Sequence, residues 1–115
     1  MGIIDNKKYT VTKSTCEVYK LRHECGMYWA DITLDCASKS GRIQIASDYG
    51  SWQNFWSCCG CSFKEFLTRL DMQYTAGKFG AEDNQGDVTP QFKRFWNEAW
   101  QVFIVQLKNE LKNNK

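Results

Sequence analysis

The hydrophobic pattern of the chain changes its period near residue 60, and this change constrains the fold more than any other feature. From Tyr28 to Cys36 apolar and polar residues alternate, which is the pattern of a half-buried strand. After Ser62 apolar residues recur every three or four positions, as they do along one face of a helix. The sequence therefore predicts a sheet followed by helices that pack on it.

Short alternating runs divide the first half of the chain into four predicted strands, between about residues 8 and 57. The first lies within Tyr9 to Leu21, where a shift in the apolar phase predicts a bulge or a strand that overruns its partner. The second is Tyr28 to Cys36, and Arg42 to Ser47 and Ser51 to Trp56 follow after turn residues. Consecutive strands joined by short turns predict an antiparallel meander.

Two helices are predicted after the strands, at about residues 62–78 and 90–112. Ser62 and Glu65 form a capping box at the first helix, and Thr89 followed by Pro90 is typical of a helix start. The polar segment from residue 80 to residue 89 predicts a mobile loop. We expect an α+β fold, with a four-stranded antiparallel meander followed by two C-terminal helices packed on one face. At 115 residues, a single domain over residues 1–115 is expected.

The second predicted helix carries more apolar residues than one face requires. Trp100, Val102, Ile104 and Val105 widen its apolar stripe around the helix. These side chains either pack between the two helices or leave an apolar surface for a partner. The core stripe of this helix is Phe92, Phe95, Trp96, Ala99, Phe103, Leu107 and Leu111.

The charge and hydropathy of the chain weigh against nucleic-acid and membrane partners. The net charge is only +2, with 15 Lys and Arg against 13 Asp and Glu, and neither half of the chain is distinctly basic. No run approaches the roughly 18 apolar residues of a membrane span, and no apolar run follows a basic segment at the N-terminus. We therefore expect a cytoplasmic protein that does not contact membranes.

Six cysteines and a single histidine are the main candidates for metal or nucleophile chemistry. Cys58, Cys59 and Cys61 with Cys25 could supply four thiolates to zinc, but the C-C-G-C cluster lacks the usual pair of C-x-x-C spacings. Cys61 precedes a predicted helix start and could pair with His23 as a nucleophile, although nothing in the sequence brings the two together. We expect no catalytic residue, no cofactor and no metal site, and keep a zinc-stabilised interaction domain as an alternative.

Aromatic residues of the predicted sheet offer a second alternative, a single-stranded nucleic-acid binding module. Aromatic side chains on a sheet can stack successive bases, and Lys39, Arg42 and Lys64 would be the nearest positive charges. Acidic residues share the same region, and aromatic residues of a small sheet more often belong to its core. The candidate stacking residues are Tyr28, Trp29, Tyr49, Trp52 and Trp56.

The segment from Gly41 to Lys78 contains a strand, the turn S-D-Y-G at residues 47–50, an aromatic strand that includes Trp56, and the helix motif F-K-E-F-L at residues 63–67. Together these motifs resemble small uncharacterised proteins of bacteriophages and prophages. The resemblance covers about forty residues, and the C-C-G-C cluster is less typical of that group. It implies a compact accessory protein of a mobile element, expressed in the cytoplasm of a bacterial host.

Such accessory proteins commonly act by binding, and anti-CRISPR and other anti-defence proteins are among them. The resemblance thus implies a non-enzymatic protein that binds and inhibits or modulates a bacterial host protein, such as a defence nuclease complex. The acidic loop could mimic phosphates towards a nucleic-acid enzyme, or it could be only a solvated linker. The expected partner-binding residues are Asp48, Tyr49 and Trp52, which we expect to be exposed, and Glu82, Asp83 and Asp87 of the acidic loop.

Overall fold

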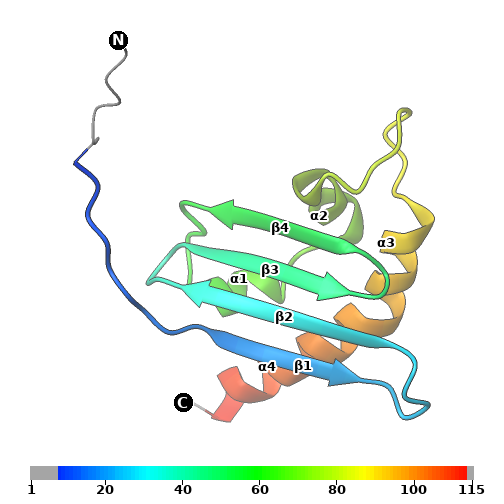
Figure 1. Cartoon of the computed structure of the whole chain (residues 1–115), viewed down its shortest axis with the longest axis horizontal. Helices are drawn as coiled ribbons and strands as arrows, with labels where there is room; N and C mark the ends of the chain where they lie inside the picture. The colour runs from blue at the N-terminus through cyan, green and yellow to red at the C-terminus, as the bar shows by residue number, and fades with distance from the viewer. Residues whose placement is uncertain (1–7, 114–115) are drawn as a thin grey trace.

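The computed structural model describes residues 8–113, which form a four-stranded antiparallel sheet followed by helices on one of its faces (Figure 1). The strands are β1 (Glu17–Arg22), β2 (Trp29–Cys36), β3 (Gly41–Ser47) and β4 (Ser51–Trp56), and they lie in the order in which they occur in the chain. The predicted α+β class with an antiparallel meander is confirmed. That residues 1–115 form one domain stays a prediction, and residues 1–7 and 114–115 lie outside the described part.

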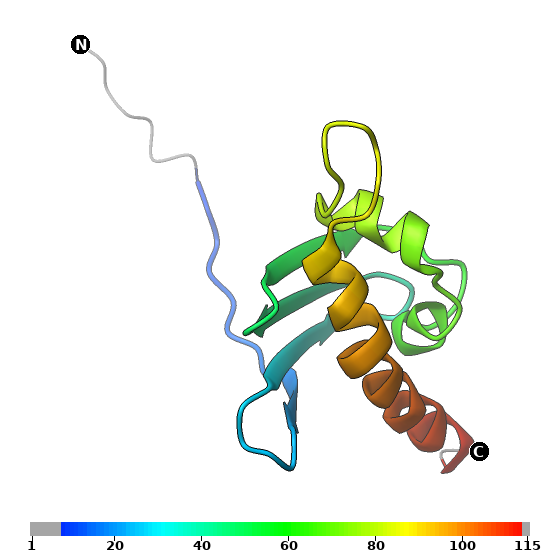
Figure 2. The same cartoon turned by 90° about the vertical axis from the view of Figure 1, so that its right-hand side faces the viewer.

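The alternation of side chains decides which face of the sheet is covered. Ala30, Ile32 and Leu34 of β2 are buried, and Ile43 and Ile45 of β3 join them on the same face. The prediction is wrong for Cys36, which the alternation places on the apolar face but which is exposed at the end of its strand. Figure 2 shows all the helices on one side of the sheet, so its other face is open.

The first strand is shorter than predicted. It begins at Glu17, which pairs with Leu34, whereas residues 9–16 lie outside the sheet and run away from the body of the protein (Figures 1 and 2). The predicted overrun is therefore present as an extended segment that pairs with no strand within residues 8–113. We refer to residues 9–16 as the arm.

The predicted helix at residues 62–78 is broken into α1 (Phe63–Leu67) and α2 (Met72–Phe79). Ser62 Oγ accepts a hydrogen bond from the Glu65 amide at 3.2 Å and caps α1, as expected. A second cap explains the break, because Asp71 Oδ1 accepts from the Tyr74 amide at 2.8 Å and starts a new helix. The apolar spacing continues across this break, so periodicity alone could not locate it.

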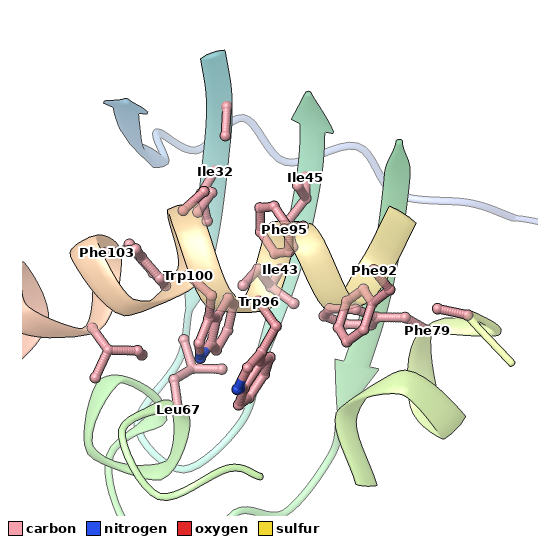
Figure 3. Close-up of a cluster of buried hydrophobic side chains, with 14 of the residues drawn as sticks. Ile32, Ile43, Ile45, Leu67, Phe79, Phe92, Phe95, Trp96, Trp100 and Phe103 are labelled. Atoms are coloured by element: carbon pink, nitrogen blue, oxygen red, sulfur yellow. The ribbon is translucent and has the colours of Figure 1, made fainter. Parts of the chain in front are cut away.

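The last helix is continuous but not uniform. It comprises α3 (Pro90–Phe95), a π-helical turn η1 (Trp96–Trp100) and α4 (Gln101–Asn113), and Thr89 caps it as predicted. The π turn contains one more residue than an α-helical turn, so the side chains that follow it point in a different direction around the helix axis. It lets the rings of Trp96 and Trp100 stack at 5.1 Å, side by side in Figure 3.

The helices bury one aromatic core against the sheet. Trp100 and Ile104, whose packing the sequence left open, are buried, whereas Val102 and Val105 stay 60% and 58% exposed. No helix within residues 8–113 is both long and apolar enough to cross a membrane. Figure 3 shows the centre of the core, which includes Ile32, Ile43, Ile45, Leu67, Phe79, Phe92, Phe95, Trp96, Trp100 and Phe103.

Candidate functional site

Three connections gather at one end of the molecule, which we name the loop end. They are the β1–β2 connection at residues 23–28, the β3–β4 turn at residues 48–50 and the loop at residues 80–89, all on the right in Figure 1 and facing the viewer in Figure 2. Loops held at one end of a rigid scaffold commonly carry binding residues. The loop end carries all the predicted partner-binding residues except Trp52, the second residue of β4, which lies beside it.

The acidic loop is a defined turn. Asp83 Oδ1 accepts hydrogen bonds from the amides of Gln85 and Asp87, both at 2.9 Å, and Glu82 pairs with Val88 in an isolated β-bridge. Asp83 therefore shapes the loop through its own backbone. Glu82 and Asp87 are exposed, and within residues 8–113 neither forms an ion pair. Glu82 Oε2 accepts a hydrogen bond from Gln73 Nε2 of α2 at 2.8 Å.

The β3–β4 turn is organised by the hydroxyl of Ser47. It donates to the Gly50 carbonyl at 2.6 Å and accepts from the amides of Tyr49 and Gly50 at 3.2 and 3.1 Å. Asp48 is exposed and its Oδ1 accepts from the Trp29 amide at 3.3 Å, so it also joins two strands. Of the residues predicted in this turn, Asp48 alone is fully available to a partner.

The predicted exposure of Tyr49 and Trp52 is wrong. Trp52 is partly buried, with its ring centroid 5.0 Å from that of Phe92 and 5.2 Å from that of Phe95. Tyr49 is also partly buried, edge-on to Phe95 at 5.9 Å. Both side chains lie on the helix side of the sheet, where the helices of the second half of the chain cover them.

Tyr49 belongs to a polar cluster that the sequence did not reveal. Its hydroxyl donates to Glu98 Oε1 at 2.8 Å, its ring stacks on Tyr28 at 6.1 Å, and the guanidinium of Arg94 lies 5.7 Å from both rings. Burial and the hydrogen bond to Glu98 raise the pKa of Tyr49 to about 12. Tyr49 and Arg94 in turn lower the pKa of Glu98 below its ordinary value. Arg94 and Glu98 are 45 and 49 positions from Tyr49 in the sequence, which is why no local pattern identifies the cluster.

A groove of about 430 Å³ runs beside this cluster, between β1 and the last helix. Its walls are mainly apolar, and Gln106 and Glu98 contribute polar groups on the helix side. Leu21 is only partly buried there, and Val102 is the most exposed large apolar side chain of the helix. The apolar walls include Tyr19, Leu21, Tyr28, Ala99, Val102 and Phe103.

The four thiols that were grouped in the zinc alternative do not lie together in the structure. Cys58, Cys59 and Cys61 follow β4, whereas Cys25 follows β1, so they lie at opposite ends of the sheet. Within residues 8–113, no three His, Cys, Asp or Glu side chains lie close enough to hold a metal ion together. The pairing of Cys61 with His23 is wrong for the same topological reason. His23 Nδ1 instead lies 3.0 Å from Cys25 Sγ.

The aromatic residues considered for base stacking lie on both sides of the sheet. Trp56 is buried on the helix side, where Tyr49 and Trp52 also lie. Trp29 is on the open face, where Arg22 lies 5.9 Å from its ring and pairs with Asp31. The open face thus lacks a continuous row formed by the predicted stacking residues.

A comparison with protein families gives the chain a context. A family model described as a phage family, Phage_phiTE_072, matches residues 9–113. The chain belongs to this phage family. No curated protein and no solved structure matches the chain. The expectation of a phage protein is confirmed, and the family description assigns no activity.

Proposed function

We propose that this phage protein is a non-enzymatic binding protein that docks its loop end on a basic surface of a bacterial host protein and so inhibits or modulates it. The observation that carries the proposal is the set of exposed carboxylates at this end. Asp48, Glu82, Asp83 and Asp87 all face solvent, and within residues 8–113 none of them forms an ion pair. Carboxylates elsewhere, such as Glu17, Asp31, Glu65 and Glu110, do pair with Lys or Arg.

Unpaired carboxylates on an ordered loop suit a partner with clustered Lys and Arg. Such a surface gains Coulomb attraction to the loop, and the attraction raises the association rate and orients the encounter. Because Asp83 holds the loop in one conformation, little conformational entropy is lost on docking. A nucleic-acid enzyme of the host, including a defence nuclease complex, presents the required basic channel, and carboxylates there would compete with phosphates.

A binding role also agrees with the arrangement of reactive groups. Cys36 is exposed as a residue, but partial desolvation of its thiol raises its pKa, as burial does for Cys59, and both thiols are therefore poorer nucleophiles at neutral pH. His23 and Cys61 lie at opposite ends of the sheet. These features support binding over thiol catalysis.

The test is capture of the partner by the tagged chain from a lysate of the bacterial host, with and without nuclease. The variant Glu82→Lys with Asp87→Lys reverses two charges and keeps the Asp83 turn, but it also removes the hydrogen bond from Gln73 to Glu82. Gln73→Ala, which removes that hydrogen bond without changing the charge, is therefore tested beside it. The control, Asp35→Lys with Glu65→Lys, changes the net charge equally away from the loop end. We expect capture to survive nuclease, to persist in the control and to weaken at least about tenfold in the loop variant.

Two results would contradict the proposal. Equal capture by the loop variant and the control would remove the acidic loop from the interface. If the captured species disappear when nuclease is added, the alternative of single-stranded nucleic-acid binding is favoured. The open face of the sheet would then be the expected binding surface. Stoichiometric zinc in the purified protein would instead favour a metal-stabilised interaction domain.

A further inference from the structure

The edge of the sheet at β1 has an unused row of backbone groups. In an antiparallel sheet the hydrogen-bonding pairs alternate, and His23 donates to the Tyr28 carbonyl at 2.9 Å. Counting back in steps of two, residues 21, 19 and 17 direct their amides and carbonyls to β2. Val18, Lys20 and Arg22 therefore direct theirs to the free edge, which can accept another strand.

The arm has the composition of a strand, and its apolar side chains are exposed. Its sequence, Y-T-V-T-K-S-T-C, is rich in residues that favour strands. Tyr9 is 82% exposed and Val11 is 93% exposed, more than any other large apolar side chain within residues 8–113. In the described part of the chain, no hydrogen bond joins the arm to residues 17–113.

We propose that the arm of a second copy adds to the free edge of β1, antiparallel to it, and that the two copies exchange arms about a two-fold axis. The eight residues of the arm are enough to cover the six residues of β1. Both free edges are then paired, and both arms acquire the hydrogen bonds that they lack in the single chain. The proposal does not rest on the proposed host partner.

The two-fold axis fixes which side chains of the arm face the groove. Because each arm continues β1, even-numbered residues of one copy bond even-numbered residues of the other, and odd-numbered residues lie opposite odd-numbered ones. Tyr19 and Leu21 face the helix side, so Tyr9 and Val11 of the second copy face it too. The two most exposed apolar side chains thus enter the groove beside Val102.

One register satisfies the groove and the charges together. With Val11 of one copy opposite Leu21 of the other, Lys13 lies opposite Tyr19, beside Glu17 and Glu110. These two carboxylates share the single amine of Lys64, so the group keeps one negative charge that Lys13 can neutralise. The same register places Cys16 opposite Cys16 of the second copy at the axis. Antiparallel strands hold bonded residues with Cα atoms about 5.5 Å apart, a separation that a disulfide can span.

The first experiment measures self-association of the full chain by sedimentation equilibrium. The variant Tyr9→Asp with Val11→Asp places two charges on the groove side of the arm. The control, Thr10→Asp with Thr12→Asp, places two charges on its opposite side. We expect a dimer for the unmodified chain and the control, and dimerisation weakened at least about tenfold in the groove-side variant.

The second experiment tests the register by copper-phenanthroline oxidation of the dilute protein. We expect a covalent dimer that forms in Cys36→Ser but not in Cys16→Ser. An unmodified chain that remains monomeric at concentrations of about 100 μM would overturn the proposal, as would equal weakening by both double variants. Crosslinking that persists in Cys16→Ser would overturn the register.

Discussion

The helix–sheet interface is filled on one side and left open on the other. Over β4, Trp52 and Trp56 reach the helices and lie 5.0 Å from Phe92 and 5.3 Å from Phe66, measured between ring centroids. Over β1, Tyr19 and Leu21 are only partly buried, and a groove of about 430 Å³ remains. The β4 side and the β1 side belong to the same sheet. The filled interface on one and the groove on the other therefore result from the size of the side chains that each strand presents to the helices.

The comparison assigns the stability of the fold mainly to β3 and β4 and leaves β1 open for the arm exchange that we propose. Large aromatic rings bury the most apolar area per residue, and they are concentrated over β3 and β4. The side over β1 can then keep exposed apolar surface, because the fold does not depend on closing it. Substitutions on the two sides should therefore differ in their effect on the free energy of unfolding.

The largest expected effect is on the filled side. Phe92→Ala removes a fully buried ring that contacts Trp52, Phe79 and Trp96, and should lower the free energy of unfolding by about 3–5 kcal/mol. Val102→Ala in the groove should cost less than about 1 kcal/mol. Urea unfolding monitored by tryptophan fluorescence measures both. Equal losses would show that the groove is as important to stability as the filled side.

A second prediction concerns how tightly the filled side is packed. A Cβ atom added at Gly41 would lie 2.3 Å from Cδ2 of Phe63, so Gly41→Ala should destabilise the protein by about 1–3 kcal/mol. In a Phe63→Leu background, the added cost of Gly41→Ala should shrink, since the ring that it meets is gone. A thermodynamic cycle of the four proteins measures this coupling. Additive losses would mean that Phe63 moves aside without cost.

A third and smaller effect is expected where α1 meets β1. Lys64 Nζ lies 2.8 Å from Glu17 Oε1 and 3.0 Å from Glu110 Oε1, and Lys64→Met should cost about 1 kcal/mol. Burial alone raises the pKa of Glu110, but hydrogen bonds from Gln106, Tyr19 and Lys64 lower it below 4.5 overall.

The pH dependence of this ion-pair cluster follows from that shift. A carboxyl whose pKa is lower in the folded state stabilises the fold above its ordinary pKa, and this contribution is lost as the pH falls. The unmodified protein should therefore lose more stability between pH 6 and pH 3 than Lys64→Met does. If stability falls equally with pH in the two proteins, Lys64 does not contribute to the lowered pKa of Glu110.

The sequence predicts the parts of the structure that depend on periodicity and on local caps. The alternation in β2 and β3 is confirmed except at Cys36, and the Ser62 and Thr89 caps are confirmed. The predicted helix stripe is buried as far as Leu107, whereas Leu111 is only partly buried. The break between α1 and α2 was missed, because the cap at Asp71 interrupts a helix whose apolar spacing continues. The length of β1 was overestimated, because strand propensity does not reveal where the chain leaves its partner: β2 continues to Cys36, two residues beyond the Leu34 that pairs with Glu17.

The site was predicted less completely than the fold. Asp48 and the acidic loop could be proposed from turn composition, and both lie at the loop end, on separate connections. The cluster of Tyr49, Glu98 and Arg94 could not be proposed, since it joins a turn to a helix about 45 positions away. The groove was equally hidden, although the surplus valine residues of the last helix were a partial signal.

The smallest predicted effect lies at Tyr49, where the filled side meets the groove. Its pKa is raised to about 12 in the folded protein, against an ordinary value of 10.0. A raised pKa means that folding favours the protonated phenol. This contribution to stability is fully present below pH 10 and is lost as the pH rises from about 10 to 12.

Tyr49→Phe should therefore flatten the loss of stability between pH 10 and pH 12 and leave stability at pH 7 changed by less than about 1 kcal/mol. Absorbance of tyrosinate should show one phenol fewer titrating near pH 12 in the folded variant. Tyr9→Phe is the control, because it removes a phenol of the arm that is 82% exposed and leaves the contact between Tyr49 and Glu98 intact. If the phenol lost in Tyr49→Phe is one that titrates near pH 10, the hydrogen bond to Glu98 is not kept in solution, and the boundary between the two sides is looser than the structure shows.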